Sequence, residues 1–182
     1  MNNQMLFRVG GIAALLTAVT YVVFPILFFS GSEVLAAIVY FISGLMFLVI
    51  LIPLSLDLSS ESKGLVIVGA ILLAGSIIWG FFLDNININP LIFGVKSLIG
   101  GLGTVLYGWL QYRSDHYPNG MGIVALLSGV FNVIPGILLL GGADVDGLAG
   151  IFIPFITVLQ LVWLIWLGVY YLRSKSATLM AA

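Results

Sequence analysis

Six long apolar runs occupy most of this 182-residue chain, and the charged residues fall almost entirely in the gaps between them. A spanning helix needs about 20 apolar residues to cross the hydrocarbon core of a bilayer. All the runs meet that length, and they cover residues 7–30, 34–56, 64–83, 90–112, 120–142 and 150–172. The sequence therefore predicts an all-α, polytopic membrane protein with six transmembrane helices in a single domain, residues 1–182.

Composition excludes several other classes of protein. A hydrophobic fraction of 62% and a charged fraction of 7% lie far outside the range of soluble globular domains. A net charge of -1 gives no reason to expect nucleic acid as a partner. Cysteine is absent and His116 is the only histidine, so bis-histidine haem ligation within the chain is excluded. We expect no cofactor and no metal, and the lipid bilayer as the first partner.

The distribution of basic residues predicts the orientation. Lysine and arginine occur at the N-terminus, in the second and fourth gaps and in the tail, as Arg8, Lys63, Arg113, Arg173 and Lys175. The first, third and fifth gaps contain no lysine or arginine and carry instead Glu33, Asp84, Asp144 and Asp146. Because cytoplasmic loops are enriched in basic residues, both termini are predicted to be cytoplasmic. The expected location is a prokaryotic plasma membrane, crossed several times.

The odd-numbered runs share a spaced pattern of small residues. Gly11, Gly69 and Gly122 open it, and pairs of small residues follow six and seven positions later, as Thr17-Ala18, Gly75-Ser76 and Ser128-Gly129. Larger and more polar residues stand ten positions after each glycine, as Tyr21, Trp79 and Asn132. The period of about 55 residues is one helical hairpin, so the pattern predicts three up-and-down hairpins related by an internal repeat. The alternative is a chance match, because small residues are common in membrane helices.

Two runs differ most in their content of small residues. Residues 90–112 contain Gly100-x-x-x-Thr104-x-x-x-Gly108, which places small side chains on one helical face. We expect this helix to be buried against its neighbours. Residues 150–172 are bulky, with aromatic residues such as Trp163 and Trp166. We expect that helix to be peripheral, facing lipid or a partner subunit.

Lys96 is the one cation outside the gaps, since it falls inside the run at 90–112. A lysine at the centre of a bilayer costs about 2.5–3.5 kcal/mol on insertion scales. Two interpretations stay open. The side chain either snorkels toward the headgroups or pairs with Asp84, or it contacts a ligand or substrate.

Polar residues accompany Lys96 in the outer half of the predicted helices. Prolines such as Pro25 and Pro135 fall in the same half and can free backbone carbonyls. These residues predict an outward-facing pocket, and the candidate ligand-binding residues are Lys96, Tyr21, Trp79, Asn132, Ser76 and Gln160. The alternative for each polar residue is a hydrogen bond to a neighbouring helix.

No catalytic constellation is present in the sequence. The predicted helices contain no carboxylate at mid-membrane and no pairing of serine with histidine, so we expect no enzymatic activity. A proton relay is not expected either, because Asp57 and Asp84 fall at helix ends.

The motif Ala14-x-x-x-Ala18, in a chain of six short-looped helices, resembles the substrate-binding components of energy-coupling-factor vitamin transporters. In that family a small-residue motif in the first helix contacts the transmembrane coupling subunit. The resemblance implies an ATPase-driven partner and an outward substrate pocket. The outer loops contain no vitamin-binding motif.

Two functions remain from the sequence. The first is a small-solute binding or transport component with an outward-facing polar pocket. The second is a non-catalytic accessory or scaffold subunit of a larger membrane complex, with other subunits packing on the first or sixth helix. A solvent-connected cavity around Lys96 favours the first function, and a dry interior favours the second.

Overall fold

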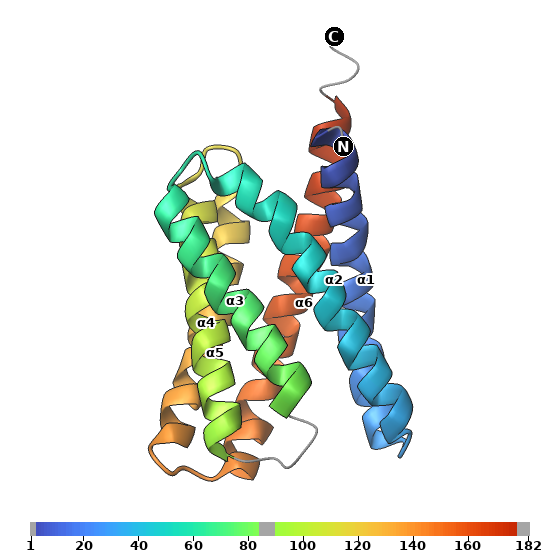
Figure 1. Cartoon of the computed structure of the whole chain (residues 1–182), viewed down its shortest axis with the longest axis vertical. Helices are drawn as coiled ribbons and strands as arrows, with labels where there is room; N and C mark the ends of the chain where they lie inside the picture. The colour runs from blue at the N-terminus through green and yellow to red at the C-terminus, as the bar shows by residue number, and fades with distance from the viewer. Residues whose placement is uncertain (1–2, 84–89, 178–182) are drawn as a thin grey trace. The chain divides into compact units, whose positions relative to one another are not determined.

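The computed structural model describes residues 3–83 and 90–177, and this part of the chain is all-helical (Figure 1). The helices are α1 (Asn3–Phe29), α2 (Glu33–Leu58), α3 (Lys63–Leu83), α4 (Pro90–Arg113), α5 (Asn119–Leu140) and α6 (Val145–Ala177). Each of the six is long and apolar enough to cross a membrane. The prediction of an all-α, multi-pass membrane protein is confirmed at this level. Residues 84–89, which contain Asp84 of the third gap, lie outside the described residues.

The helix ends follow from local chemistry. Pro90 is the first residue of α4. The N–H group at that position has no partner within a helix, so proline, which lacks it, loses no hydrogen bond there. Gly31 and Gly142 adopt φ values of 78° and 88°, which side-chain-bearing residues rarely adopt, and they reverse the chain after α1 and α5. The helix α6 extends beyond its apolar run at both ends, because a helix keeps its own backbone bonds in the headgroup region.

The C-termini of α1 and α5 end in the same hydrogen-bonded turn. In each, the backbone N–H groups of three successive residues donate to carbonyl oxygens of the last helical turn. The third residue bonds to a carbonyl that lies one residue before the carbonyl bonded by the second residue. The bonds are Ser30 N to Ile26 O, Gly31 N to Phe28 O and Ser32 N to Leu27 O after α1, and Gly141 N to Ile137 O, Gly142 N to Leu139 O and Ala143 N to Leu138 O after α5. These equivalent positions are 111 residues apart, as are Gly11 and Gly122 of the predicted repeat. The internal repeat itself stays a prediction.

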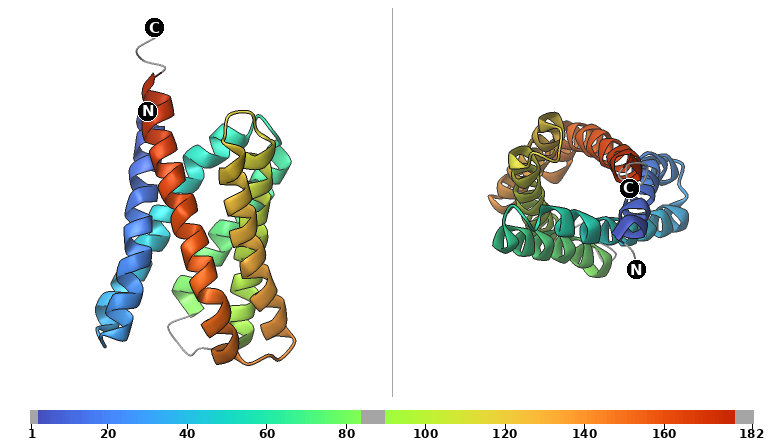
Figure 2. Two further views of the ribbon diagram at one scale, coloured as in Figure 1. Left: turned by 180° about the vertical axis from the view of Figure 1, so that it is seen from behind. Right: turned by 90° about the horizontal axis from the view of Figure 1, so that it is seen from above.

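The chain divides into two compact units. The first unit contains Met1–Asp57 and Leu161–Ala182, and the second contains Leu58–Gln160. Within each unit the successive helices α1 and α2, or α3, α4 and α5, run antiparallel (Figure 2). The helix α6 contributes its first part to the second unit and its remainder to the first. The prediction of one domain stays a prediction.

The core of the first unit combines bulky side chains with small residues of α1. The ring of Phe7 lies 5.3 Å from that of Tyr171, and the rings of Phe47 and Trp163 lie 6.0 Å apart. The helices approach closely where a glycine meets a side chain, since a methyl group at Gly10 would collide with the Pro53 ring. Small residues share this core, since Ala13, Ala14, Thr17 and Ala18 of α1 are buried as well.

The second half of the sixth helix is exposed at Val162, Ile165 and Trp166, as expected of a peripheral helix, but its opposite face is buried. Trp163, Leu164, Leu167 and Tyr171 are completely buried. A methyl group at Gly168 would lie 2.8 Å from the Leu15 side chain and 3.0 Å from the carbonyl oxygen of Gly11. The single glycine lets α6 approach α1, so its bulky neighbours pack inward. Its first half keeps exposed residues, including Ile151 and Phe155.

The second unit is held together by close backbone contact between α4 and α5, which lie side by side (Figures 1 and 2). Every seventh residue of each helix is glycine along this seam, which we call the glycine seam: Gly94, Gly101 and Gly108 on α4, and Gly122, Gly129 and Gly136 on α5. All six are buried. Because lipid offers no hydrophobic drive for helix association, such close packing is what stabilises the pair.

The contacts across the glycine seam are mainly with backbone atoms. A methyl group at Gly129 would lie 2.6 Å from the Val105 nitrogen and 2.8 Å from the Gly101 oxygen. At Gly108 it would lie 2.5 Å from the Leu126 nitrogen. The helix α3 joins the same unit, since a methyl group at Gly103 would lie 3.1 Å from the Leu73 nitrogen. The expected burial of the run at 90–112 is confirmed. The contacts with α5 follow a seven-residue spacing, and Gly100 of the predicted four-residue pattern lies instead against Ser76 of α3.

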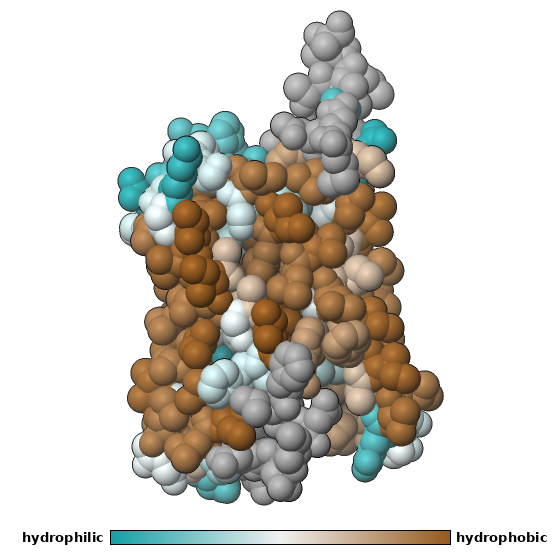
Figure 3. Space-filling view, in the orientation of Figure 1, coloured by the Kyte–Doolittle hydropathy of each residue, from teal (hydrophilic) through white to brown (hydrophobic). Residues whose placement is uncertain are grey.

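The distribution of polar and apolar residues on the surface agrees with a membrane-spanning arrangement. In the second unit, polar residues gather over the turns between α2 and α3 and between α4 and α5, whereas the flanks of the helices are apolar (Figure 3). Exposed side chains on these flanks include Ile67, Ile71 and Ile123. An apolar flank bounded by polar ends matches a lipid-facing surface.

Candidate functional site

Lys96 lies inside the apolar length of α4 and is half-buried. Its ammonium nitrogen stands 5.9 Å from the centre of the Phe93 ring, within the range of a cation–π contact. The predicted alternative partner, Asp84, lies outside the described residues. The lysine is therefore held against an aromatic face of its own helix.

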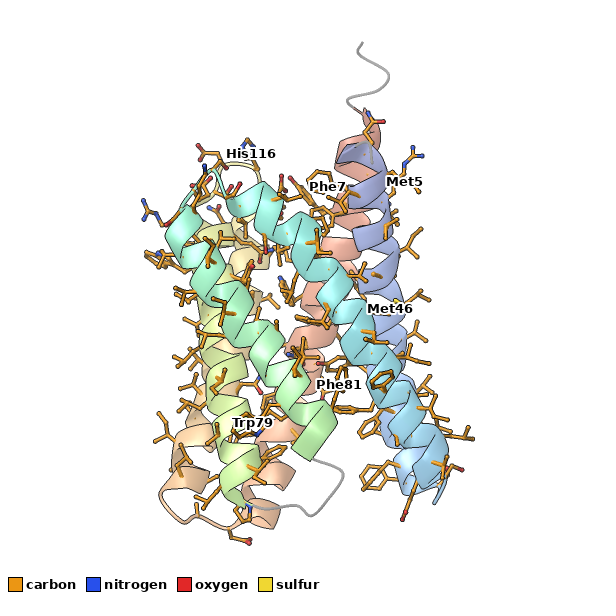
Figure 4. All side chains as sticks on the ribbon, viewed as in Figure 1. Met5, Phe7, Met46, Trp79, Phe81 and His116 are labelled. Carbon is orange, nitrogen blue, oxygen red and sulfur yellow. The ribbon has the colours of Figure 1, made fainter. Side chains whose placement is uncertain are left out.

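The helix α3 approaches α4 at the same level. The Ser76 hydroxyl donates a hydrogen bond of 3.1 Å to the main-chain carbonyl of Lys96. Ser76 also lies against Gly100, where a methyl group would come within 2.6 Å of its Oγ. Trp79 follows one turn later on α3 and is 37% exposed, near the end of the helix opposite to His116 (Figure 4). Of the predicted site residues, the structure thus brings Ser76 together with the backbone of Lys96.

The other predicted residues occupy separate positions. Asn132 donates from Nδ2 to the Ser128 carbonyl of its own helix at 3.1 Å. Gln160 lies half-buried on α6. Tyr21 is half-buried on α1 and belongs to the first unit, whereas the other five belong to the second. That these six residues form one binding site stays a prediction.

A row of polar side chains runs along α4 beside the glycine seam, and it includes Thr104 of the predicted small-residue face and Gln111, which sequence reasoning did not single out. Ser97, Thr104, Gln111 and Tyr107 belong to it, and the last three are almost completely buried. The Thr104 hydroxyl donates to the Gly100 carbonyl at 2.9 Å, and the Tyr107 hydroxyl donates to the Val66 carbonyl of α3 at 3.4 Å. Polar groups thus extend through the interior of the second unit.

Ser128 of α5 differs from these residues. It is 0% exposed, and within residues 3–83 and 90–177 its hydroxyl oxygen is buried without a hydrogen-bond partner. A buried polar group without a partner is unfavourable, and native proteins contain few of them. The sequence carried a signal for this region in the glycines that recur every seventh residue, which fix the face of α5 on which Ser128 lies.

The Ala14–Ala18 face of α1 does not lie open. Ala14 is 0% exposed and Ala18 is 5% exposed. That this motif contacts a separate subunit, as the resemblance to energy-coupling-factor components implies, stays a prediction.

No group of three or more histidine, cysteine, aspartate or glutamate side chains stands close enough to hold a metal ion in the described ranges 3–83 and 90–177. His116 lies exposed in the turn between α4 and α5, where its N–H donates to the Ser114 hydroxyl at 3.3 Å.

Comparison with known proteins found no matching family model, curated protein or solved structure.

Proposed function

We propose that this chain is a small-solute binding or transport component of a membrane, with Lys96 at its binding site. The observation that carries the proposal is the position of Lys96, half-buried within a spanning helix and beside the contact between α3 and α4. Ionisable residues inside membranes are rare because of their insertion cost, and they commonly mark substrate or ion pathways. Lys96 supplies a positive charge there for an anionic or carbonyl group of the solute.

Neighbouring residues suit the apolar and polar parts of such a solute. Trp79 and Phe93 offer aromatic surface near Lys96 on α3 and α4. Ser76 fixes the α4 backbone at this level through its bond to the Lys96 carbonyl. A site of aromatic surface with a few placed polar groups is typical of small-molecule binding.

We propose a cytoplasmic location for both termini and an outward-facing site. The distribution of basic residues supports this orientation. In the second unit Lys63 begins α3 and Arg113 ends α4, at the same end of the hairpin, and both are exposed. In the first unit Arg8 lies near the start of α1 and Arg173 near the end of α6, and both are again exposed. The proposed location is a prokaryotic plasma membrane, and the proposed role is not enzymatic.

Native mass spectrometry of the full chain in mild detergent tests the proposal. Lys96→Ala is compared with Lys63→Ala, which removes a cation from an exposed helix end. We expect a small molecule to be retained by the wild type and by Lys63→Ala, and to be lost from Lys96→Ala. Retention of the same molecule by Lys96→Ala would contradict the proposal.

An accessory or scaffold role is the second candidate, and one surface favours it. Ile151, Phe155 and Val158 recur along one face of α6 and are 60%, 56% and 58% exposed. The Phe155 ring is stacked on Phe131 of α5 at 5.6 Å, which fixes this face in place. A stoichiometric membrane partner without any retained small molecule, in the same mass spectra, would favour this role.

A further inference from the structure

The second unit contains an unusual buried hydroxyl group on Ser128. A serine or threonine inside a membrane helix normally donates to a carbonyl one turn earlier. Thr17 of α1 does so, with a bond of 2.8 Å to the Ala13 carbonyl. Ser128 is equally buried, yet its Oγ has no partner among the described residues. The oxygen is therefore open to bonding with a group that is not part of the chain.

The register of the glycine seam shows what faces Ser128. The Nε2 atom of Gln111 lies 3.8 Å from the sulfur of Met121, so these two residues are level on one side of the seam. The helices α4 and α5 are antiparallel, and the glycines of the seam recur every seven residues on both. Residues seven positions before Gln111 and seven positions after Met121 therefore lie on the same faces as these two residues. Thr104 of α4 is therefore level with Ser128, and Gly100 is level with Asn132.

Two of the four donor hydrogens on the side chains of this cluster are committed to the backbone. Thr104 donates its hydroxyl hydrogen to the Gly100 carbonyl, and Asn132 donates from Nδ2 to the Ser128 carbonyl. Their Oγ1 and Oδ1 atoms keep lone pairs that can accept, as does Oγ of Ser128. The cluster consequently presents three side-chain oxygen atoms that can accept, beside one hydrogen each on Ser128 Oγ and Asn132 Nδ2 that these bonds do not use.

Pro135 adds a backbone oxygen to the same face. It lies inside α5 and is buried. Because proline has no N–H, it cannot donate to the carbonyl of Phe131, one turn earlier. That carbonyl is directed toward Pro135, which shares a helix face with Ser128 and Asn132 by its spacing.

We propose that Ser128, Thr104, Asn132 and the Phe131 carbonyl form a binding site for a monovalent metal cation, with Na⁺ as the expected ion. Hydroxyl, amide and carbonyl oxygens are hard ligands suited to such an ion, and discontinuities in membrane helices coordinate Na⁺ with backbone carbonyls. The set contains no carboxylate, so it does not offset the charge of a divalent ion as calcium sites do. This site goes beyond the proposed solute site and does not depend on Lys96.

Thermal unfolding of the full chain in detergent tests the site. The Tm is measured in saturating NaCl and in choline chloride of equal ionic strength. The wild type is expected to gain about 4 °C in NaCl, since a ligand that binds only the folded state raises Tm. Ser128→Ala and Thr104→Val are expected to lose this gain. Thr17→Val is the matched control, because it removes an equally buried hydroxyl from the first unit.

The outcomes separate the site from general salt effects. A gain that Thr17→Val keeps and Ser128→Ala loses supports the proposal. An equal Tm of the wild type in both salts, or a gain that persists in Ser128→Ala, would overturn it. If Ser128→Ala does not fold, the Tm of the wild type is compared in NaCl, KCl and LiCl. A coordinating site predicts Tm values that differ between these salts, and a general salt effect predicts equal values.

Discussion

The helices α1 and α5 carry equivalent small residues 111 positions apart, but these residues make different contacts. In α1, Gly11 meets α6 at one close approach, near Gly168. In α5, Gly122 opens a series of glycines that follow α4 along its length. Thr17 of α1 donates to its own helix, whereas Ser128, its counterpart in α5, has no partner among the described residues.

This difference distinguishes residues that only pack helices together from residues that are available to bind a ligand. Thr17 and Thr104 both donate to carbonyls of their own helices, so the contrast rests on Ser128, whose hydroxyl makes no such bond among the described residues. Where the backbones are held together by glycine, side chains beside the contact are free to face one another. Ser128 and Thr104 are in that situation next to the glycine seam. The second unit is therefore the better candidate for binding.

The largest effect is expected from Gly129→Ala. The added methyl group would press on backbone atoms of Val105 and Gly101, which cannot move alone, so we expect a loss of about 3 kcal/mol in unfolding free energy. Gly75→Ala is the matched control, since the position is open and a helical Gly-to-Ala change stabilises by about 0.5–1 kcal/mol. Denaturant unfolding followed by circular dichroism measures both. Equal stability of the two variants would remove the glycine seam as the main contact of the second unit.

A smaller loss is expected from Gly11→Ala in the first unit. The methyl group would lie 3.0 Å from the Gly168 oxygen and 3.0 Å from Cγ of Leu172. A leucine side chain can shift, so we expect a loss of about 1 kcal/mol in unfolding free energy, by the same assay. A loss as large as that of Gly129→Ala would contradict the contrast between one close approach and a continuous seam.

The two helix ends should respond alike. Gly31→Ala and Gly142→Ala each force a side chain into the left-handed region, and each is expected to lose about 1 kcal/mol in unfolding free energy. Equal losses in the unfolding assay would support the internal repeat, because equivalent turns would then have equivalent energies. A loss in only one variant would count against equivalence of α1 and α5.

The smallest effect concerns a single backbone oxygen. Pro135→Ala restores an N–H that can bond to the Phe131 carbonyl, so the Na⁺-dependent gain in Tm should fall by about 2 °C. Pro25→Ala changes the proline inside α1 and should leave the gain intact. Melting curves in NaCl and choline chloride give both values. An unchanged gain in Pro135→Ala would exclude the Phe131 carbonyl from the site.

Hydropathy alone predicted the number and type of the helices, because each run of about 20 apolar residues has few alternatives to spanning a bilayer. Lys96 was also identifiable, as a cation within such a run. Its surroundings were not, since the bond from Ser76 depends on how α3 meets α4. Hydropathy carries no information on such contacts between helices.

The inward packing of α6 shows a second limit. Trp163 and Tyr171 have the bulk expected at a lipid surface, yet they are buried because Gly168 brings α6 onto α1. Ser128 shows a third limit. Sequence identified it as one of many small residues, and the missing hydrogen bond became apparent only from the arrangement of neighbouring atoms.

Binding of radioactive sodium to the purified chain, measured by scintillation proximity, determines whether the second unit holds Na⁺ at Ser128. We expect one saturable class of site that Thr17→Val keeps and Ser128→Ala loses. Saturable binding that survives in Ser128→Ala, or no saturable binding in the wild type, would contradict it.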